Sequence, residues 1–410
     1  MNLEQSESIK VQFDEICKHI SILVPDPKKS GSEYYVGLQH LDREDIHLKR
    51  HGVPEDVSKT KLRFKKGHIL FGKRNWYLRR LAIAPFDGIC SAHMIVLEPI
   101  AGKIIKEFLP LLMLSDIFYE KALMISEGSM SPTIKWKSLA NLEFVLPSIE
   151  TQKSIIYLIS IIDENIFYSE KIEKEIIHLK KSLQHKLLHK GLNHKKFQKL
   201  RMGLWDVDEE FPESWKILKL GDVCSVERGK FTHRPRGDPA YYGGKYPFIQ
   251  TSDVVNSDGY ITKYSQTLND TGLSVSKIFP PDTVIITIAA NIGSTSITTF
   301  PVCFPDSIVG ISSPKMDPVF LRNFLELRKP FLNIIATESA QKNINLETMK
   351  NLFIPVPDIA EQKQIAEIFS KLDKQLELTK QQTMILKTLK KSSLHSMMKL
   401  KPIRTKKIVQ

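Results

Sequence analysis

Apolar residues recur at alternating spacings of three and four along two long stretches of the chain, which begin near residues 148 and 358. Residues 150–190 contain no glycine or proline, so nothing interrupts the first pattern. Each stripe is apolar at its start and diluted by polar residues later, as in a heptad seam. The spacing predicts two helices of about 40 residues, each about 60 Å long. The predicted apolar seam residues are Ile155, Ile159, Ile162, Ile166, Ile176, Leu183, Ile365, Phe369, Leu372, Leu376 and Leu386.

Shorter apolar runs precede each predicted helix. Four runs are strand-like, at residues 66–72, 94–99, 283–289 and 307–312, and two longer runs, at 101–123 and 318–335, are helix-like. Because strands and helices mix in both places, we predict an α+β protein with two similar mixed α/β globular parts. The predicted regions are a globular part at 1–147, a helical region at 148–207, a second globular part at 208–357, and a second helical region with a basic tail at 358–410.

The second half of the chain repeats the first. A shift of 210 residues places NLEFVLPSIETQKSII (141–156) on NLFIPVPDIAEQKQIA (351–366), and without a gap it also places Asp163 on Asp373 and residues 179–182 on 389–392. Upstream the similarity is looser, but it still aligns the cysteines in pairs, Cys17 with Cys224 and Cys90 with Cys303. We interpret these cysteines as small buried residues of two equivalent cores.

Two duplicated helices with one apolar stripe each are the nearest partners for one another. Because the second globular part lies between them in the chain, an antiparallel coiled coil within one molecule closes most easily, and it would have pseudo-twofold symmetry. A dimer in which the helices pair between chains is the alternative, since the stripe alone does not choose between the two.

Residues 357–363, PDIAEQK, resemble part of a metal-dependent nuclease pattern, a PD dipeptide followed by ExK. In the first copy Asp358 and Glu361 are replaced by Ser148 and Thr151, and the gap between the two acids is too short for that pattern. A helix N-cap alternates freely between Asp and Ser, because both offer an oxygen to the free N–H groups of the first turn. We therefore predict that Ser148 and Asp358 are helix caps, and we assign no catalytic residue and no metal ligand.

The composition adds one feature, an excess of basic over acidic residues. The chain has 59 Lys and Arg against 46 Asp and Glu, a formal net charge of +13. This favours a polyanionic partner such as nucleic acid, although a solvated surface excess would look the same. The apolar runs are shorter than the ~18 to 20 residues of a spanning helix, and the N-terminus lacks the features of a secretory signal. We therefore expect a cytoplasmic protein.

Basic, aromatic and amide residues mix in loop-like segments of both globular parts, at 41–52, 72–80 and 228–253. The last segment is rich in glycine and proline, which predicts irregular structure. Arg and Lys suit phosphates and guanine edges, and Gln suits adenine, although mobile surface loops have the same composition. The candidate DNA-binding residues are Arg43, Lys49, Arg50, Lys73, Arg74, Arg79, Lys230, Arg234, Arg236, Tyr241, Tyr242, Lys245, Gln250 and Ser252.

Taken together, the chain resembles the specificity subunit of type I restriction-modification systems. The resemblance covers nearly the whole chain and rests on the two-copy layout and on LPSIETQKSII (146–156) and VPDIAEQKQIA (356–366). YVGLQHLD (35–42), WKILKLGDVCSVERGK (215–230) and YPFIQTSDV (246–254) add to it. The first copy departs from the family in two respects: it lacks a counterpart of the opening from Trp215 to Gly221, and it has Thr151 where the family favours Glu.

The resemblance implies two target-recognition domains that each read one half of a split, asymmetric DNA site, with the helices as a ruler that fixes the gap. It implies double-stranded DNA and two methyltransferase subunits as partners, and no cofactor on this chain. Those subunits use S-adenosylmethionine to methylate adenine N6, and restriction subunits, where they join, use ATP and magnesium. An independent enzyme is disfavoured, because the chain lacks a G-x-x-x-x-G-K-[ST] loop, an N/D-P-P-Y/F motif and a G-x-G-x-x-G after a strand. The remaining alternative is a freestanding DNA-binding or coiled-coil scaffold protein.

Overall fold

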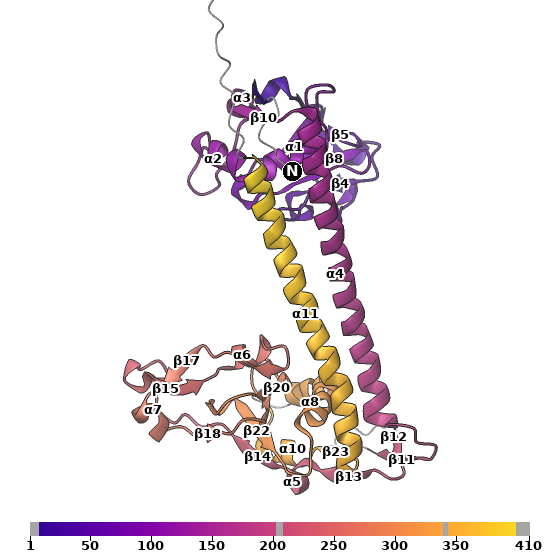
Figure 1. Ribbon diagram of the computed structural model, residues 1–410, viewed down its shortest axis with the longest axis vertical. Coiled ribbons are helices and arrows are strands. Elements are labelled where there is room, and N and C mark those ends of the chain that lie inside the picture. The colour runs from indigo at the N-terminus through magenta and orange to yellow at the C-terminus, as the bar shows by residue number, and fades with distance from the viewer. Residues whose placement is uncertain (1–7, 202–207, 339–342, 399–410) are drawn as a thin grey trace, which may run out of the picture. The chain divides into compact units, whose positions relative to one another are not determined.

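The computed structural model describes residues 8–201, 208–338 and 343–398. The chain forms two compact units: the first comprises residues 1–168 and 383–410, and the second comprises residues 169–382. The division crosses both long helices, α4 (Ile149–Lys190) and α11 (Ile359–Met398). Each unit therefore contains one globular part and one portion of each helix (Figure 1).

The first unit closes its globular part by pairing β1 (Ile9–Gln12) antiparallel with β10 (Glu143–Leu146), just before α4 begins. One four-stranded sheet has the order β2-β9-β6-β7, and the other has the order β3-β5-β8-β4. The strands of these sheets are β2 (Cys17–Ile20), β3 (Leu23–Val24), β4 (Tyr35–Val36), β5 (Lys61–Phe64), β6 (Ile69–Gly72), β7 (Leu81–Ile83), β8 (Gly88–Ser91) and β9 (Met94–Pro99). Helices α1 (Phe108–Leu114), α2 (Asp116–Met124) and α3 (Trp136–Ala140) lie between β9 and β10 in the chain.

The second unit repeats this plan with more strands. Its closing pair is β13 (Lys216–Lys219) with β23 (Phe353–Val356), and a hairpin of β11 (Phe197–Arg201) and β12 (Asp208–Pro212) follows α4. Its two larger sheets have the orders β14-β22-β19-β20-β16 and β17-β15-β21-β18. The strands of these sheets are β14 (Ser225–Arg228), β15 (Tyr242–Phe248), β16 (Tyr260–Ile261), β17 (Gln266–Leu268), β18 (Ile278–Phe279), β19 (Val284–Thr287), β20 (Thr295–Thr298), β21 (Val302–Cys303) and β22 (Ile308–Ser312). The helices are α5 (Leu220–Val223), α6 (Thr251–Val255), α7 (Asp270–Ser274), α8 (Pro318–Leu327), α9 (Lys329–Glu338) and α10 (Leu346–Lys350).

The duplication predicted from the sequence is confirmed by strand pairing. Ile9 lies opposite Leu146 in the first unit, and Lys216 lies opposite Val356 in the second. Val36 pairs with Cys90 in a parallel register, as Phe248 does with Cys303. All four cysteines are buried and free, and burial raises the pKa of each thiol, that of Cys90 to about 12. They are packing residues of equivalent cores, with no reactive thiolate at neutral pH.

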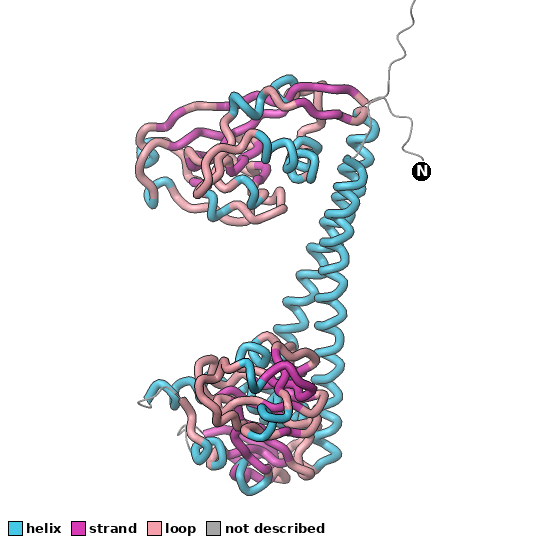
Figure 2. The backbone as a smooth tube through the Cα atoms, turned by 90° about the vertical axis from the view of Figure 1, so that its left-hand side faces the viewer, coloured by secondary structure: helices cyan, strands magenta, loops and turns pink. Residues whose placement is uncertain are grey.

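The two long helices pair antiparallel within the chain, as predicted, and in each unit they run side by side (Figures 1 and 2). In the first unit Ile155 and Ile159, early in α4, share a buried cluster with Leu394 and Met398, late in α11. In the second unit the order is reversed: residues late in α4 share a buried cluster with Ile365 and Phe369, early in α11. The alternative of a dimer built by helix pairing between chains is not needed to cover these side chains.

The middle of the seam is polar and buried. Ser169 Oγ donates to the carbonyl oxygen of Thr379 at 3.4 Å, and both side chains are at most 3% exposed. These two residues are 210 positions apart, so they are equivalent in the two copies. A contact between equivalent residues is what a twofold relation between two helices produces.

Two sequence expectations are wrong in detail. Each long helical run, 101–123 and 318–335, is broken into two helices, because Ser115 caps α2 through its hydroxyl in an extended conformation and Arg328 ends α8. The glycine-rich segment 228–253 is not irregular throughout, since β15 occupies Tyr242–Phe248 and pairs with β17 and β21. Local composition missed this strand, because its pairing partners, β17 and β21, lie outside the segment.

Candidate nucleic-acid interface

The candidate loop of the second unit is held in place by aromatic packing. Phe231, Phe248 and Leu268 are buried together, and Tyr241 and Tyr242 pack against them. The ring of His233 stacks on that of Tyr241 with centroids 3.9 Å apart. The loop residues are therefore presented from a defined surface of the fold.

Two arginines of this loop converge on one acid. Arg236 forms an ion pair with Asp306, and Arg234 Nη2 lies 3.6 Å from Asp306 Oδ2. Arg234 also donates from Nη1 to the carbonyl oxygens of Phe231 and His233, at 2.7 and 2.8 Å. Both side chains remain about half exposed, at 52% and 46%. The ion pairs orient the guanidinium groups and leave part of each accessible.

The remaining candidate residues of the second unit differ in how far their side chains are free to contact DNA. Lys230, Lys245 and Ser252 are exposed, and Lys245 Nζ is 3.8 Å from Asp270. The Tyr242 hydroxyl donates to the Arg236 carbonyl oxygen, and burial raises the pKa of Tyr242, so it stays a neutral donor. Tyr242 therefore supports the arginine loop, and so does Tyr241 through its stacked ring.

In the first unit, Lys73 and Arg74 lie in a positive environment next to His93. Burial lowers the pKa of His93, and the neighbouring charges of Arg74, Lys73 and Lys61 lower it further. Arg74 is exposed, and its Nη2 donates to Ser131 Oγ at 3.3 Å. This cluster of cations is the strongest phosphate-binding candidate of the first unit.

Most of the other candidate residues of the first unit form ion pairs within the protein. Lys49 Nζ is 2.7 Å from Asp45, and Arg50 forms an ion pair with Asp42. Arg43 is exposed. Arg79 is a structural residue: it donates to Asp116 at 2.6 Å and to the Leu114 carbonyl oxygen at 3.2 Å, and its side chain is only 16% exposed. These contacts use the guanidinium inside the fold, so Arg79 is not available as a reading residue.

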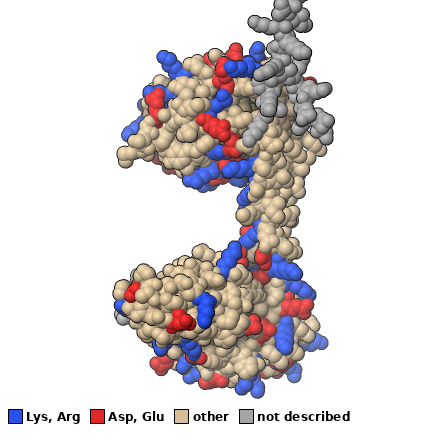
Figure 3. All heavy atoms as spheres, turned by 60° about the vertical axis from the view of Figure 1, so that its left-hand side comes forward, with Lys and Arg blue, Asp and Glu red and all other residues tan. Residues whose placement is uncertain are grey.

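The surface charge is mixed. Figure 3 shows Lys and Arg side chains interspersed with Asp and Glu on the visible face of each unit. The net charge of +13 is therefore not gathered into one uniform patch on that face. With charges mixed in this way, selection of a ligand would depend on individual side chains and not on a uniform positive surface.

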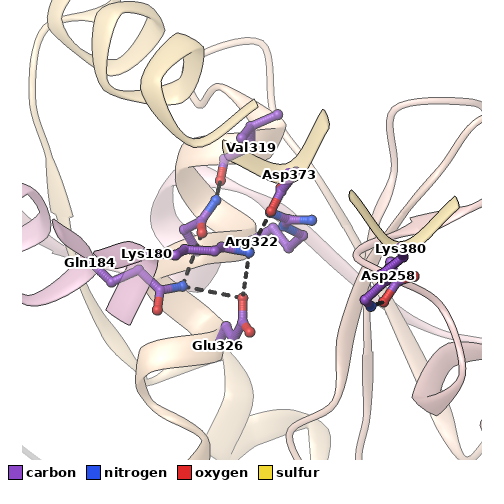
Figure 4. Close-up of polar contacts among 9 residues, drawn as sticks. Lys180, Gln184, Asp258, Val319, Arg322, Glu326, Asp373 and Lys380 are labelled. Carbon is purple, nitrogen blue, oxygen red and sulfur yellow. Dashed lines mark hydrogen bonds and ion pairs between the residues drawn. The ribbon is translucent and has the colours of Figure 1, made fainter. Parts of the chain in front are cut away.

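Sequence reasoning missed a polar junction in the second unit, between α8 and the long helices (Figure 4). Arg322, fully buried, donates to Asp373 at 2.5 Å, and Lys180 Nζ lies 2.7 Å from the same carboxylate. Gln184 donates to Asn323 at 3.0 Å and to Glu326 at 3.2 Å. The junction fixes α8 to both helices. Its sequence signal is that Lys180 and Asp373 both recur in the repeat, as Lys390 and Asp163.

The nuclease-like residues have structural roles. Asp358 Oδ1 accepts from the N–H groups of Ala360 and Glu361, at 2.9 and 3.0 Å, and Ser148 Oγ accepts from Thr151 N–H at 3.3 Å. Glu361 accepts from Trp215 Nε1 at 2.9 Å and from Leu192 N–H at 2.8 Å, and it lies 2.8 Å from His194. The first copy lacks counterparts of both Trp215 and Glu361, so its two departures remove both partners of this hydrogen bond. Within the described ranges, no group of three or more His, Cys, Asp or Glu residues is placed to hold a metal ion.

Among the described residues, no helix has the length and apolar content needed to cross a membrane.

Known proteins are similar to this chain in sequence. The profile of the family described as type I restriction modification DNA specificity domain matches residues 53–178 and 212–388. The chain is 27% identical over 316 residues to the type I restriction enzyme MjaVIII specificity subunit of Methanocaldococcus jannaschii, covering 72% of this chain and 70% of that protein. It is 22% identical over 397 residues to the type I restriction enzyme HindI specificity subunit of Haemophilus influenzae, covering 81% of this chain and 84% of that protein.

Two solved structures have a similar fold. A chain from a type I restriction-modification system aligns with a TM-score of 0.63 at 20% identity, covering 97% of this chain and 99% of that chain. The type I S subunit from M. genitalium aligns with a TM-score of 0.57 at 13% identity, covering 97% and 98%. At these identities the likeness concerns the fold alone.

Proposed function

Because the chain belongs to the family of type I restriction-modification DNA specificity domains, we propose that it is the subunit that reads DNA sequence for a partner methyltransferase. In this proposal each unit reads one half of a split, asymmetric site in double-stranded DNA. Partner subunits bind S-adenosylmethionine and methylate adenine, and restriction subunits, where they join, use ATP and magnesium. This chain binds and positions, and it makes or breaks no covalent bond.

One observation carries the proposal: the two units share a frame but differ in their exposed loop residues. The closing strand pair, the Cys90 and Cys303 strands and the helix caps are repeated. The exposed polar side chains carried by these shared strands and helices are not repeated. In the second unit Arg234 and Arg236 meet at Asp306. In the first unit Lys73 and Arg74 lie next to His93. Equivalent frames with unlike contacts suit two unlike half-sites.

The long helices are proposed as the ruler and as the platform for the methyltransferase subunits. In the first unit they expose several large apolar side chains to solvent: Tyr157 at 68%, Phe167 at 62%, Met384 at 72% and Ile385 at 66%. Exposed apolar groups of this size favour a protein partner. Two methyltransferase subunits, one for each copy, follow from the duplication.

The test is to sequence the methylome of cells with and without this gene. A split methylated motif that disappears with the gene supports the proposal. The freestanding DNA-binding or scaffold alternative predicts no change in methylation and no methyltransferase in a pull-down with the full chain. Methylation or cleavage of DNA by the purified chain alone would contradict the non-catalytic role.

A further inference from the structure

The turn that follows β15 in the second unit is tied to the start of β17 by one carboxylate. Gln250 is the N-cap residue of α6, and its backbone N–H donates to Asp253 Oδ2 at 2.7 Å. The Ser265 hydroxyl donates to the same oxygen at 2.8 Å. Asp253 therefore holds residues 250 and 265 next to each other, although 15 positions separate them in the chain.

The side chains of two glutamines, Gln250 and Gln266, contact each other next to the hydrogen bonds of Asp253. Gln250 Nε2 donates to Gln266 Oε1 at 3.1 Å. Gln266 is exposed and starts β17 opposite Phe248, while Gln250 is half-buried. Within the described ranges no other protein group engages the two side-chain amides, so the Gln250 oxygen and the Gln266 amide nitrogen are left for a ligand.

Two hydrogen-bonded amides that leave one acceptor and one donor free match the chemistry of adenine. In the major groove adenine presents its N6 amino group as a donor and N7 as an acceptor, and a glutamine side chain pairs with both. Because Asp253 holds the backbone of Gln250 and Gln266 holds its side-chain amide, less side-chain entropy is lost on binding. We propose that Gln250 and Gln266 form an amide pair that reads an adenine in the half-site of the second unit, with Asp253 as the positioning residue. The inference rests on the proposed function.

The residues just before Gln266 are also exposed and could contact the same DNA. Thr262, Lys263, Tyr264 and Ser265 form an exposed run that leads directly into it. An exposed lysine within three residues of the amide pair is placed to contact a phosphate while the amides contact a base.

The first unit has no such pair at the equivalent turn. After Val36, which pairs with Cys90 as Phe248 does with Cys303, Gly37 occupies the N-cap position, and its N–H donates to His40 Nδ1 at 3.0 Å. Gly37 has no side chain, and the Gln39 amide lies against it where a Cβ would be. Gly37 follows Val36 by one position and Gln250 follows Phe248 by two, so the two units place different amide groups in the corresponding turn without aligning them residue for residue.

The experiment uses the full chain in complex with its methyltransferase. Methyl transfer is measured on duplexes in which each base pair of the two half-sites is replaced in turn, for the wild type, Gln266→Ala, Gln266→Glu and Gln250→Ala. The matched control is Gln381→Ala, which removes an exposed glutamine of the same unit whose amide donates to Glu377 on α11. The expected result is a loss of roughly 5- to 150-fold in discrimination at one A·T pair of one half-site, with the other half-site and the control unchanged.

Two results would overturn the inference. Discrimination at every position within twofold of the wild type would show that the pair reads no base. An equal loss on all sequences, with a weaker salt dependence, would assign the residues to the phosphate backbone. Failure of the proposed function is distinguishable, because the wild-type complex would then methylate no split site.

Discussion

Lys180 and Asp373 form an ion pair of 2.7 Å between α4 and α11, and the same pair recurs 210 residues away with the helices exchanged, as Lys390 and Asp163 at 2.6 Å. Each helix contributes one lysine and one aspartate. The two pairs differ in surroundings: Asp373 also accepts from the buried Arg322, and its side chain is 7% exposed, whereas that of Asp163 is 20% exposed.

Asp373→Asn should therefore lower the free energy of unfolding much more than Asp163→Asn does. The first change leaves Arg322 and Lys180 without their carboxylate in a buried place, which costs about 3 to 5 kcal/mol of unfolding free energy. The second removes one partly exposed pair and should cost about 1 kcal/mol. Denaturant unfolding with hydrogen exchange in α8 measures the difference. Equal losses would show that Arg322 does not depend on Asp373.

Arg234→Ala or Arg236→Ala should weaken reading of one half-site by roughly 1 to 3 kcal/mol for each base that the arginine no longer reaches, and should leave the other half-site intact. Arg74→Ala in the first unit is the matched change and should affect the opposite half. Binding of the complex to duplexes with single base replacements measures both. A uniform loss on every sequence would mean that these arginines bind only phosphates.

Inserting seven residues after Glu170 in α4 and after Lys380 in α11 should lengthen the gap of the methylated site. Seven residues add about 10 Å of helix and nearly preserve the seam, which corresponds to about three base pairs at 3.4 Å each. Methylome sequencing reads the new gap. An unchanged gap in a folded, active complex would refute the ruler.

Asp358→Ala should cost about 1 kcal/mol of stability, because two N–H groups of the first turn lose their acceptor. Ser148→Ala is the matched change in the other copy and should cost a similar amount. Thermal or denaturant unfolding measures both. If either substitution abolished a reaction of the isolated chain, the cap assignment would be incomplete.

Glu209 should make the second unit sensitive to acid. Burial opposes its ionisation, but ion pairs with Arg328 and with His189, 3.2 Å away, outweigh it and lower the pKa of Glu209 from 4.5 to about 2. Because the folded pKa lies below the unfolded one, the stabilisation is complete above about pH 4.5 and is lost as the pH falls toward 2.

Unfolding free energy measured between pH 2 and 5 tests this, with Glu209→Gln as the comparison. The wild type should lose up to about 3 kcal/mol more than the variant across that range. Parallel curves for the two proteins would show that the carboxylate contributes no such linkage.

The sequence by itself determined the duplication, the two long helices with their caps and the buried cysteines, but it left helix pairing within one chain and between two chains both open. The helices and their caps follow from local rules, because a 3.5-residue period and a capping oxygen involve only neighbouring residues. The duplication is visible because residues 210 positions apart match when the chain is aligned with itself.

Only the tertiary structure decided which polar side chains are used inside the fold. Arg79 and Arg234 are both arginines in polar segments, yet one is held by Asp116 and Leu114 and the other is half exposed. The meeting of Gln250 with Gln266, of Arg322 with Asp373, and of Glu361 with Trp215 joins residues from 16 to 146 positions apart. Such contacts depend on strand pairing and helix packing across the unit, and the order of residues along the chain carries no local sign of them.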